Sequence, residues 1–148
     1  MIYYIVGQPH AGKTTLSKLL KQHLFPQNII QIDGDDLRDI FQNKDYSEEG
    51  RRNNIKRAQD IAMFLNAKGV DVIISLVSPY KDLRDDLKGK SDVTEIYVHT
   101  DDIRGRENFH VENYEKPTEN YIDIDTTGVS EFTSLGELIA KINEYGNK

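Results

Sequence analysis

The stretch Gly7-Gln8-Pro9-His10-Ala11-Gly12-Lys13-Thr14 decides the fold of this chain. It fits the pattern G-x-x-x-x-G-K-[ST], whose glycines let the backbone amides turn inward around phosphate groups. The apolar run Ile2-Tyr3-Tyr4-Ile5-Val6 precedes it, and a helical pattern near 13–24 follows it. A strand, a glycine loop and a helix N-terminus in this order form an anion-binding unit. The sequence therefore predicts that residues 7–14, here called the phosphate loop, bind the phosphates of ATP.

The side chains of the phosphate loop have separate expected roles. We expect Lys13 to neutralise the β and γ phosphates and the Thr14 hydroxyl to bind Mg²⁺. His10 is not needed for the phosphate cradle and is interpreted as a solvated loop residue. The predicted ATP phosphate contacts are Gly7, Gln8, Pro9, His10, Ala11, Gly12, Lys13, Thr14 and Thr15.

Outward from the loop, apolar runs of strand length alternate with helical patterns. Strands are predicted at residues 2–6, 29–32, 70–77, 93–99 and 121–125, and helices near 13–24, 35–42, 48–68, 80–88 and 131–145. This alternation predicts an α/β, three-layer P-loop NTPase fold, with a five-stranded parallel sheet and helices on both faces. We expect one kinase domain over residues 1–148. A lid is predicted at about 100–120, the longest stretch without a clear pattern.

Composition narrows the class of protein. The chain has 148 residues, 37% of them apolar and 30% charged, which is typical of a soluble globular protein. Its net charge of −6 disfavours a nucleic-acid partner, because phosphate neutralisation needs a basic surface. With no cysteine, the chain cannot form disulfides or Cys-ligated zinc sites. No apolar run is long enough to span a bilayer, and the first residues lack the pattern of a signal peptide. We expect a cytoplasmic enzyme without a membrane partner, and a homodimer is considered.

An acidic turn, Asp33-Gly34-Asp35-Asp36, follows the second predicted strand. Ligands of α/β proteins bind at the carboxyl ends of strands, so Asp33 and Asp35 are expected beside the phosphate loop. There a carboxylate can accept the proton of an attacking hydroxyl or hold a magnesium-bound water. We predict that both are catalytic, and the sequence does not rank them. Asp36 is interpreted as an acid that favours the first turn of a helix.

Two further blocks point to the partner of ATP. The predicted helix from residue 48 carries Arg51, Arg52, Lys56 and Arg57 near its start, which could be a solvated basic face. Four basic residues within seven positions of an acidic protein favour instead a site for an anionic ligand. Ser78-Pro79-Tyr80 follows the third predicted strand. Because Pro79 forces a turn, Ser78 and Tyr80 are expected to face the crevice.

Taken in order, these blocks resemble the adenylylsulfate kinase family over about residues 2–127. The resemblance is carried by GQPHAGKT, Asp33-Gly34-Asp35 with Arg38, Tyr46-Ser47 with Arg51, Asn54, Ile55, Lys56 and Arg57, Val77-Ser78-Pro79-Tyr80-Lys81, and Tyr114-Glu115-Lys116-Pro117. It implies a kinase that uses ATP and Mg²⁺ to phosphorylate the 3′-hydroxyl of adenosine 5′-phosphosulfate.

The resemblance also implies roles for single residues. Arg38, Arg51 and Asn54 would hold the phosphosulfate and its nucleotide. Tyr46, where the family has phenylalanine, would stack on the acceptor base, since stacking needs only an aromatic face. Ser78 would mark the acceptor side, and Asp33 or Asp35 would be the base, with a slight preference for Asp35.

The sequence departs from the family pattern at several positions. Gly50 replaces an aspartate, and Lys56 and Lys81 replace arginines. The lid stretch is shortened, and Arg104, Arg106 and Phe109 are the possible contacts left in it. Phe109 is equally well interpreted as packing beneath the loop.

Other functions remain open on this evidence. One alternative is a kinase of the same fold for another nucleotide or a nucleotide-linked sugar. A nucleotide-dependent switch is disfavoured, because Asn43-Lys44-Asp45 lacks the spacing of a guanine motif and Asp125-Thr126-Thr127-Gly128 follows the wrong strand. A noncatalytic relative is disfavoured by the retained loop and acidic residues.

Overall fold

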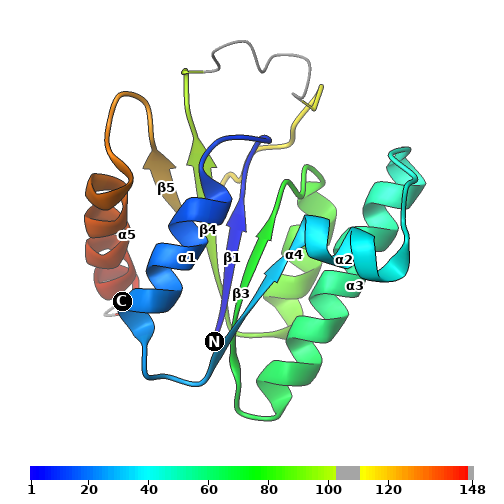
Figure 1. Cartoon of the computed structure of the whole chain (residues 1–148), viewed down its shortest axis with the longest axis horizontal. Coiled ribbons are helices and arrows are strands. Elements are labelled where there is room, and N and C mark those ends of the chain that lie inside the picture. Colours follow the sequence, from blue (N-terminus) through cyan, green and yellow to red (C-terminus); the bar gives the residue numbers. More distant parts are fainter. Residues whose placement is uncertain (103–110, 147–148) are drawn as a thin grey trace.

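The computed structural model describes residues 1–102 and 111–146, so the predicted lid residues Arg104, Arg106 and Phe109 lie outside the described residues. Its elements, in chain order, are β1 (Ile2–Val6), α1 (Lys13–Leu24), β2 (Ile29–Asp33), α2 (Gly34–Phe41), α3 (Glu48–Ala67), β3 (Asp71–Leu76), α4 (Lys81–Lys90), β4 (Val93–His99), β5 (Tyr121–Asp125) and α5 (Glu131–Gly146). Each begins and ends within a residue or two of its predicted bounds (Figure 1).

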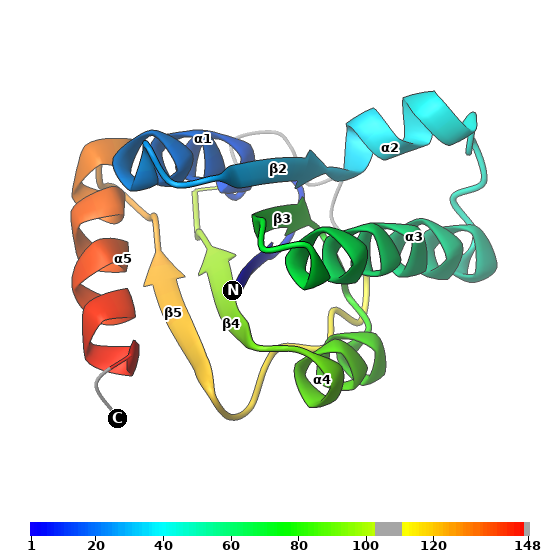
Figure 2. The ribbon, with the colours of Figure 1, turned by 90° about the horizontal axis from the view of Figure 1, so that it is seen from below.

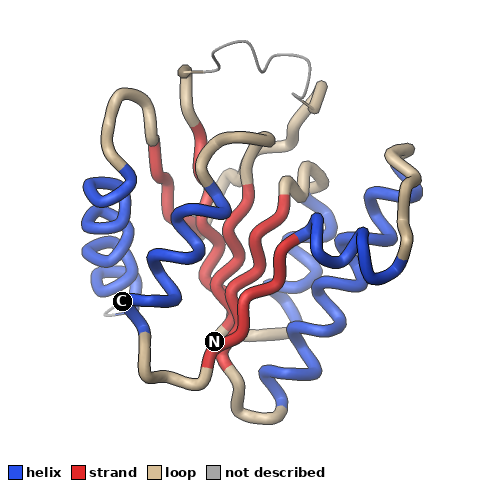
Figure 3. Tube along the Cα trace, in the orientation of Figure 1, coloured by secondary structure: helices blue, strands red, loops and turns tan. Residues whose placement is uncertain are grey.

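The five strands form one parallel sheet in the order β2-β3-β1-β4-β5. This confirms the predicted three-layer fold. Because every strand points the same way, all the carboxyl ends lie at one edge of the sheet, the upper edge in Figure 3. β1 leads into the phosphate loop at that edge, and its neighbour but one, β2, leads into the acidic turn.

Helices cover both faces of the sheet, with α1 and α5 on one side and α2, α3 and α4 on the other (Figures 1 and 2). The central strand β1 is buried along its whole length, and its alternate side chains enter two separate cores. Tyr3 and Ile5 pack with Leu16 and Leu20 of α1. The other alternate set of β1 side chains packs with Leu37, Ile55, Ala58 and Ala62 of α2 and α3. A strand buried on both faces requires the continuous apolar run seen in the sequence.

Local signals set the ends of α3. The Ser47 hydroxyl caps its first turn by accepting a hydrogen bond from the Gly50 amide at 3.3 Å. Gly69, with φ +84°, lets the chain turn back toward β3. Within the part of the chain that the structure describes, no helix is both long enough and apolar enough to cross a membrane.

Candidate active site

A cavity of about 830 Å³ lies at the carboxyl edge of the sheet, between the phosphate loop and α3. Most of the predicted site residues line it. From the donor side these are Pro9, His10, Gly12, Lys13, Thr14 and Thr15, and from the remaining walls Asp33, Asp35, Arg38, Tyr46, Arg51, Asn54 and Ser78. Gly7, Gln8 and Ala11 of the phosphate loop do not line this cavity. The fold thus brings residues from distant blocks of sequence to one place.

The phosphate loop needs glycine at its first position for reasons of space. A Cβ atom on Gly7 would lie 2.1 Å from the Val98 carbonyl oxygen of β4, and Gly7 has φ +152°. Gly12, with φ +99°, then turns the chain into α1. Both positions require a backbone that other residues rarely adopt. The loop therefore starts against the sheet and ends at a helix N-terminus, as phosphate binding requires.

Lys13 is held inside the loop rather than in solvent. Its residue is only 8% exposed, and its Nζ donates a hydrogen bond to the Gln8 carbonyl oxygen at 2.7 Å. Burial lowers the pKa of Lys13 to about 8, an effect that the nearby carboxylates of Asp33 and Asp35 partly oppose. A buried ammonium with few partners is ready to bind an anion, because phosphate oxygens would restore its lost solvation.

Asp33 joins the acidic turn to the phosphate loop. Its Oδ1 caps α2 by accepting a hydrogen bond from the Asp35 amide at 2.9 Å, and its Oδ2 accepts one from the Thr14 hydroxyl at 3.1 Å. A hydroxyl and a carboxylate side by side suit Mg²⁺, which prefers oxygen ligands and takes few from the protein when phosphates supply others. Asp35 lies in the first turn of α2 and lines the cavity, and among the described residues its carboxylate forms no hydrogen bond or ion pair.

Arg38 and Tyr46 form a pair on the far wall of the cavity. The Arg38 guanidinium carbon lies 4.1 Å from the centre of the Tyr46 ring. The same guanidinium donates hydrogen bonds to the carbonyl oxygens of Asn43 and Asp45, at 3.1 and 3.2 Å. Tyr46 is 63% exposed, so one ring face is covered by arginine while much of the rest of the ring remains accessible. Such a ring offers a stacking surface for a nucleobase.

The four basic residues at the start of α3 do not act together. Arg51 lines the cavity, and no partner for its guanidinium is recorded within residues 1–102 and 111–146. Arg52 instead pairs with Glu48 and Asp82, each at 2.9 Å. The other two also lie elsewhere: Lys56 is near Asp60 and Asp86, and Arg57 stacks on Phe41. The solvated-face interpretation therefore fits three of the four, and an anion site fits Arg51.

Asn54 brings a buried polar atom to the cavity. The residue is 5% exposed, and its Nδ2 donates to the Gly34 carbonyl oxygen at 3.4 Å. Its Oδ1 is buried without a hydrogen-bond partner among the described residues. Because a buried acceptor without a donor is costly, this oxygen suits a donor group supplied by a ligand.

Ser78 lies at the cavity and Tyr80 does not. Ser78 lines the cavity with φ +44°, and its Oγ lies 2.6 Å from the Tyr4 hydroxyl. Tyr80, predicted to face the same crevice, does not line it. Its ring packs against the core beneath α3 and is covered by the Arg52 guanidinium at 4.3 Å. The turn at Pro79 separates the two side chains.

The departure at Gly50 has a steric cause. A Cβ atom there would lie 2.2 Å from the Asp45 carbonyl oxygen and 2.4 Å from its Cγ. The chain between α2 and α3 therefore packs directly on Gly50, and the Asn43 side chain also donates to the Gly50 carbonyl oxygen. A side chain at position 50 would therefore clash with Asp45.

Sequence reasoning missed a set of buried polar residues behind the cavity: Tyr4, Gln59, Arg84 and Glu95. Arg84 is fully buried and pairs with Glu95 at 2.7 Å. One signal was available, since Glu95 is a charged residue inside the otherwise apolar stretch of β4. Arg84 carried no such signal, because a basic residue in a charged helix resembles a surface residue.

A parallel sheet of this strand order, with a G-x-x-x-x-G-K-[ST] loop after β1 and an acidic turn after β2, defines a P-loop kinase fold. Residues 1–133 match the family described as adenylylsulphate kinase. The chain therefore belongs to the adenylylsulphate kinase family, which confirms the resemblance seen in the sequence.

The chain is also similar to individual proteins of known name. It is 33% identical over 100 residues to the adenylyl-sulfate kinase of Gloeothece citriformis, covering 65% of this chain and 57% of that protein. It is 29% identical over 131 residues to the cytidine diphosphoramidate kinase of Campylobacter jejuni, covering 84% and 77%. The Mycobacterium tuberculosis APS kinase CysC, solved with AMPPNP and APS, superposes with a TM-score of 0.80 at 18% identity, covering 96% of both chains. The chain spans about half the length of the adenylyl-sulfate kinases it matches.

Proposed function

We propose that this chain, acting as one kinase domain, transfers the γ-phosphoryl group of ATP to a hydroxyl of a nucleotide that bears an anionic group. The first candidate acceptor is adenosine 5′-phosphosulfate, whose 3′-hydroxyl would receive the phosphate to give 3′-phosphoadenylylsulfate. One observation carries the proposal. A single cavity is lined by the buried Lys13, by the carboxylates of Asp33 and Asp35, and by Arg38, Tyr46 and Arg51.

The donor half of the reaction rests on Lys13 and the loop amides. The Lys13 ammonium neutralises charge on the transferring phosphoryl group, and the phosphate loop holds the remaining oxygens. Thr14 and Asp33 would hold Mg²⁺, which would supply charge neutralisation at the phosphates. Asp33 has both oxygens engaged, with the Thr14 hydroxyl and the Asp35 amide.

The acceptor half rests on Asp35, Arg51 and Tyr46. Asp35 is the better candidate for the base, because its carboxylate is exposed to the cavity and has no recorded partner among the described residues. It would accept the proton of the attacking hydroxyl as the new O–P bond forms and the bond between the γ-phosphorus and the bridging oxygen breaks, with ADP as the leaving group. Arg51 pairs with the acceptor's anionic group, and Tyr46 stacks on its base.

A second candidate acceptor is a nucleotide with a phosphoramidate group. The similarity to the cytidine diphosphoramidate kinase covers 84% of this chain, whereas that to the Gloeothece adenylyl-sulfate kinase covers 65%. Both acceptors are nucleotides that carry a second polar group on a phosphate. Arg51 could bind that group in either acceptor.

The test is a panel of acceptors with ATP and Mg²⁺. We expect ATP consumption with adenosine 5′-phosphosulfate at the highest kcat/KM, beside cytidine diphosphoramidate, AMP and CDP. Lys13→Ala serves as the blank. A higher kcat/KM for cytidine diphosphoramidate would move the assignment to the second candidate, and no turnover with any acceptor would contradict the proposed function. Whether the chain works as a homodimer stays a prediction, which sedimentation would test.

A further inference from the structure

We propose that Gln8 is a positioning residue, which fixes residues 111–117 to the phosphate loop and thereby sets the distance between the phosphates of ATP and the acceptor. The inference rests on the proposed function in one respect, that an acceptor binds in the same cavity. Residues 111–117 are here called the return segment, since they lead the chain back from the cavity toward β5.

The Gln8 side chain holds the return segment by a paired contact. Its Nε2 donates to the Val111 carbonyl oxygen at 2.8 Å, and its Oε1 accepts from the Val111 amide at 2.8 Å. An amide side chain that satisfies both backbone groups of one residue fixes its orientation as well as its position. Val111 itself lines the cavity.

The Gln8 backbone serves the catalytic side of the same arrangement. Its carbonyl oxygen accepts a hydrogen bond from the Lys13 Nζ at 2.7 Å and another from the Ala11 amide at 3.3 Å. One residue therefore touches the lysine that neutralises ATP through its main chain and the return segment through its side chain. A change in where Gln8 lies alters both.

The return segment is also fixed at its other end. The Tyr114 hydroxyl donates to the Val77 carbonyl oxygen at 2.5 Å, the same atom that accepts from the Gly7 amide at 3.4 Å. Burial raises the pKa of Tyr114 above its ordinary value, so the phenol remains a donor. The start of the phosphate loop, the end of β3 and the return segment thus meet at one carbonyl.

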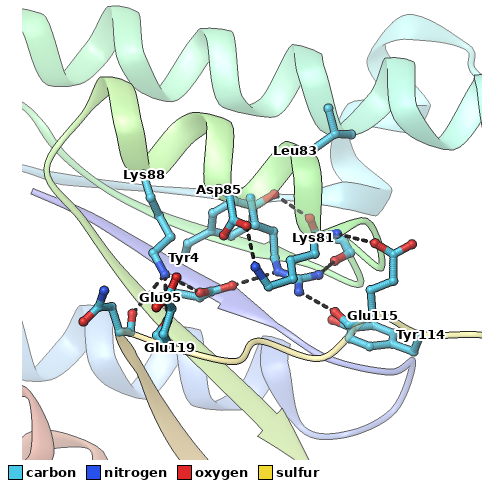
Figure 4. A network of polar contacts seen from close by, with 12 residues as sticks. Tyr4, Lys81, Leu83, Asp85, Lys88, Glu95, Tyr114, Glu115 and Glu119 are labelled. Carbon is cyan, nitrogen blue, oxygen red and sulfur yellow. Dashed lines mark hydrogen bonds and ion pairs between the residues drawn. The ribbon is translucent and has the colours of Figure 1, made fainter.

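Arg84 joins the return segment to the Ser78 turn. Its guanidinium donates hydrogen bonds to the Ser78 carbonyl oxygen at 2.6 Å and to the Glu115 carbonyl oxygen. The Glu95 carboxylate forms an ion pair with the same guanidinium. The Glu115 carboxylate accepts a hydrogen bond from the Lys81 amide at 2.9 Å, and the Glu115 backbone amide donates one to the Pro79 carbonyl oxygen at 3.1 Å. Figure 4 shows Glu95, Tyr114 and Glu115 in this network.

These contacts join the Ser78 turn and the return segment into one hydrogen-bonded wall, with the buried residues Ser78 and Arg84 at its centre. The paired Gln8 contact joins that wall to the side of the loop that carries Lys13. Because a misplacement of reacting groups by a fraction of an ångström lowers transfer rates, this contact should influence catalysis more than folding.

The experiment compares Gln8→Leu, which removes both hydrogen bonds, with Gln8→Glu, which keeps an acceptor for the Val111 amide but loses the donor. Gln22→Leu is the matched control, since Gln22 is an exposed residue of α1 remote from the cavity. Amide hydrogen exchange at Val111 and Tyr114 is measured with and without AMPPNP. AMPPNP affinity, thermal midpoints and steady-state kinetics with the best acceptor of the panel complete the set.

For Gln8→Leu we expect Val111 to exchange about tenfold faster, as the loss of a protecting hydrogen bond predicts. We also expect kcat to fall about tenfold and the acceptor KM to rise, with AMPPNP affinity within about threefold of the wild type, because the loop amides and Lys13 remain. The exchange rate, kcat and acceptor KM of Gln8→Glu should lie between those of Gln8→Leu and the wild type. Those of Gln22→Leu should equal the wild-type values. AMPPNP should slow Val111 exchange in the wild type and not in Gln8→Leu.

Unchanged Val111 exchange in Gln8→Leu would overturn the inference, as would faster exchange accompanied only by a lower thermal midpoint and normal kinetics. A failure of the proposed function looks different. No acceptor would then be turned over by the wild type, while the effect of AMPPNP on Val111 exchange would still report whether Gln8 couples the loop to the return segment.

Discussion

The two walls of the cavity are built in different ways. The donor wall is the phosphate loop, one uninterrupted run of sequence whose function depends on backbone amides and a single buried lysine. The acceptor wall draws on the ends of α2 and α3, on the Ser78 turn and on Val111, and it depends on side chains. Most substitutions leave the positions of backbone amides unchanged, whereas each substitution on the acceptor wall changes a side chain that forms it. We therefore expect ATP binding to be retained across variants and acceptor binding to be easily altered.

The largest effect should come from Lys13→Ala. We expect the transfer rate to fall by about 10³-fold or more, because Lys13 is the only lysine or arginine of the phosphate loop and its charge stabilises the loose transition state. Fixed-time assays of ATP consumption measure this rate. Lys18→Ala, an exposed lysine of α1, is the control and should be unaffected. Near-normal turnover of Lys13→Ala would contradict the difference described between the two walls, since the donor wall would then not depend on its lysine.

The acidic turn lies between the two walls, and its carboxylates should separate them. Asp35→Asn is expected to lower kcat by about 10²- to 10³-fold with little change in ATP affinity, as loss of a general base predicts. Asp33→Asn should instead raise the Mg²⁺ concentration needed for half-maximal activity, because Asp33 contacts Thr14 and the two are proposed to hold Mg²⁺. Titrations of Mg²⁺ and ATP with both variants measure this, with Asp36→Asn as control.

Reversed outcomes would exchange the two roles. If Asp33→Asn removed turnover at saturating Mg²⁺ and Asp35→Asn did not, Asp33 would be the base. No effect from either variant would remove the acidic turn from the mechanism.

The strands, helices and phosphate loop were predictable because each is a local pattern. The place of Asp33 beside the phosphate loop, seen in its contact with Thr14, also follows from topology, since all parallel strands of one sheet end at the same edge. The paired contact of Gln8 with Val111 was not predictable, because the two residues are 103 positions apart and neither has an unusual neighbourhood in sequence.

Other features depended on packing that sequence does not display. Tyr80 follows Ser78 by only two residues, yet the turn and the Arg52 stacking send its ring away from the cavity. Gly50 looked like a lost aspartate, but the structure gives it the role of leaving room for Asp45. The direction of a side chain after a turn is set by its tertiary neighbours. Tyr80 and Gly50 adjoin residues of the acceptor wall, Pro79 and Arg51, so these neighbours influence the site.

A change on the acceptor wall should leave the donor wall intact. Arg51→Ala is expected to raise the acceptor KM about 10- to 100-fold, the loss expected for a charged hydrogen-bonded pair, with ATP affinity nearly unchanged. Arg51→Lys should recover only part, because an ammonium lacks the two-pronged geometry. Steady-state titration of each substrate measures the split.

Arg52→Ala is the matched control, since its guanidinium pairs with Glu48 and Asp82 and does not line the cavity. A loss of ATP affinity in Arg51→Ala, with the acceptor KM unchanged, would assign Arg51 to the donor side. The assignment of Tyr46 and Asn54 to the acceptor would then fail with it.

The smallest expected effect is a pH dependence confined to the donor wall. Burial lowers the pKa of Lys13 to about 8, from an ordinary value of 10.5. Below about pH 8 the free protein already carries the charged lysine, so ATP binding needs no proton and its affinity should be constant. Above about pH 8 the free lysine is neutral and binding must take up a proton. ATP affinity should then fall about tenfold per pH unit.

Stability should change in the opposite sense. Since the folded-state pKa of Lys13 lies below the unfolded one, the buried charge costs stability below about pH 8, and this cost is relieved as pH rises toward 10.5. The free energy of unfolding, measured against that of Lys13→Ala over this range, should therefore increase with pH while ATP affinity decreases. Lys13→Arg, which stays charged, should show neither trend. Constant ATP affinity of the wild type up to pH 9.5 would mean that the lysine is solvated, and that the donor wall is as open as the acceptor wall.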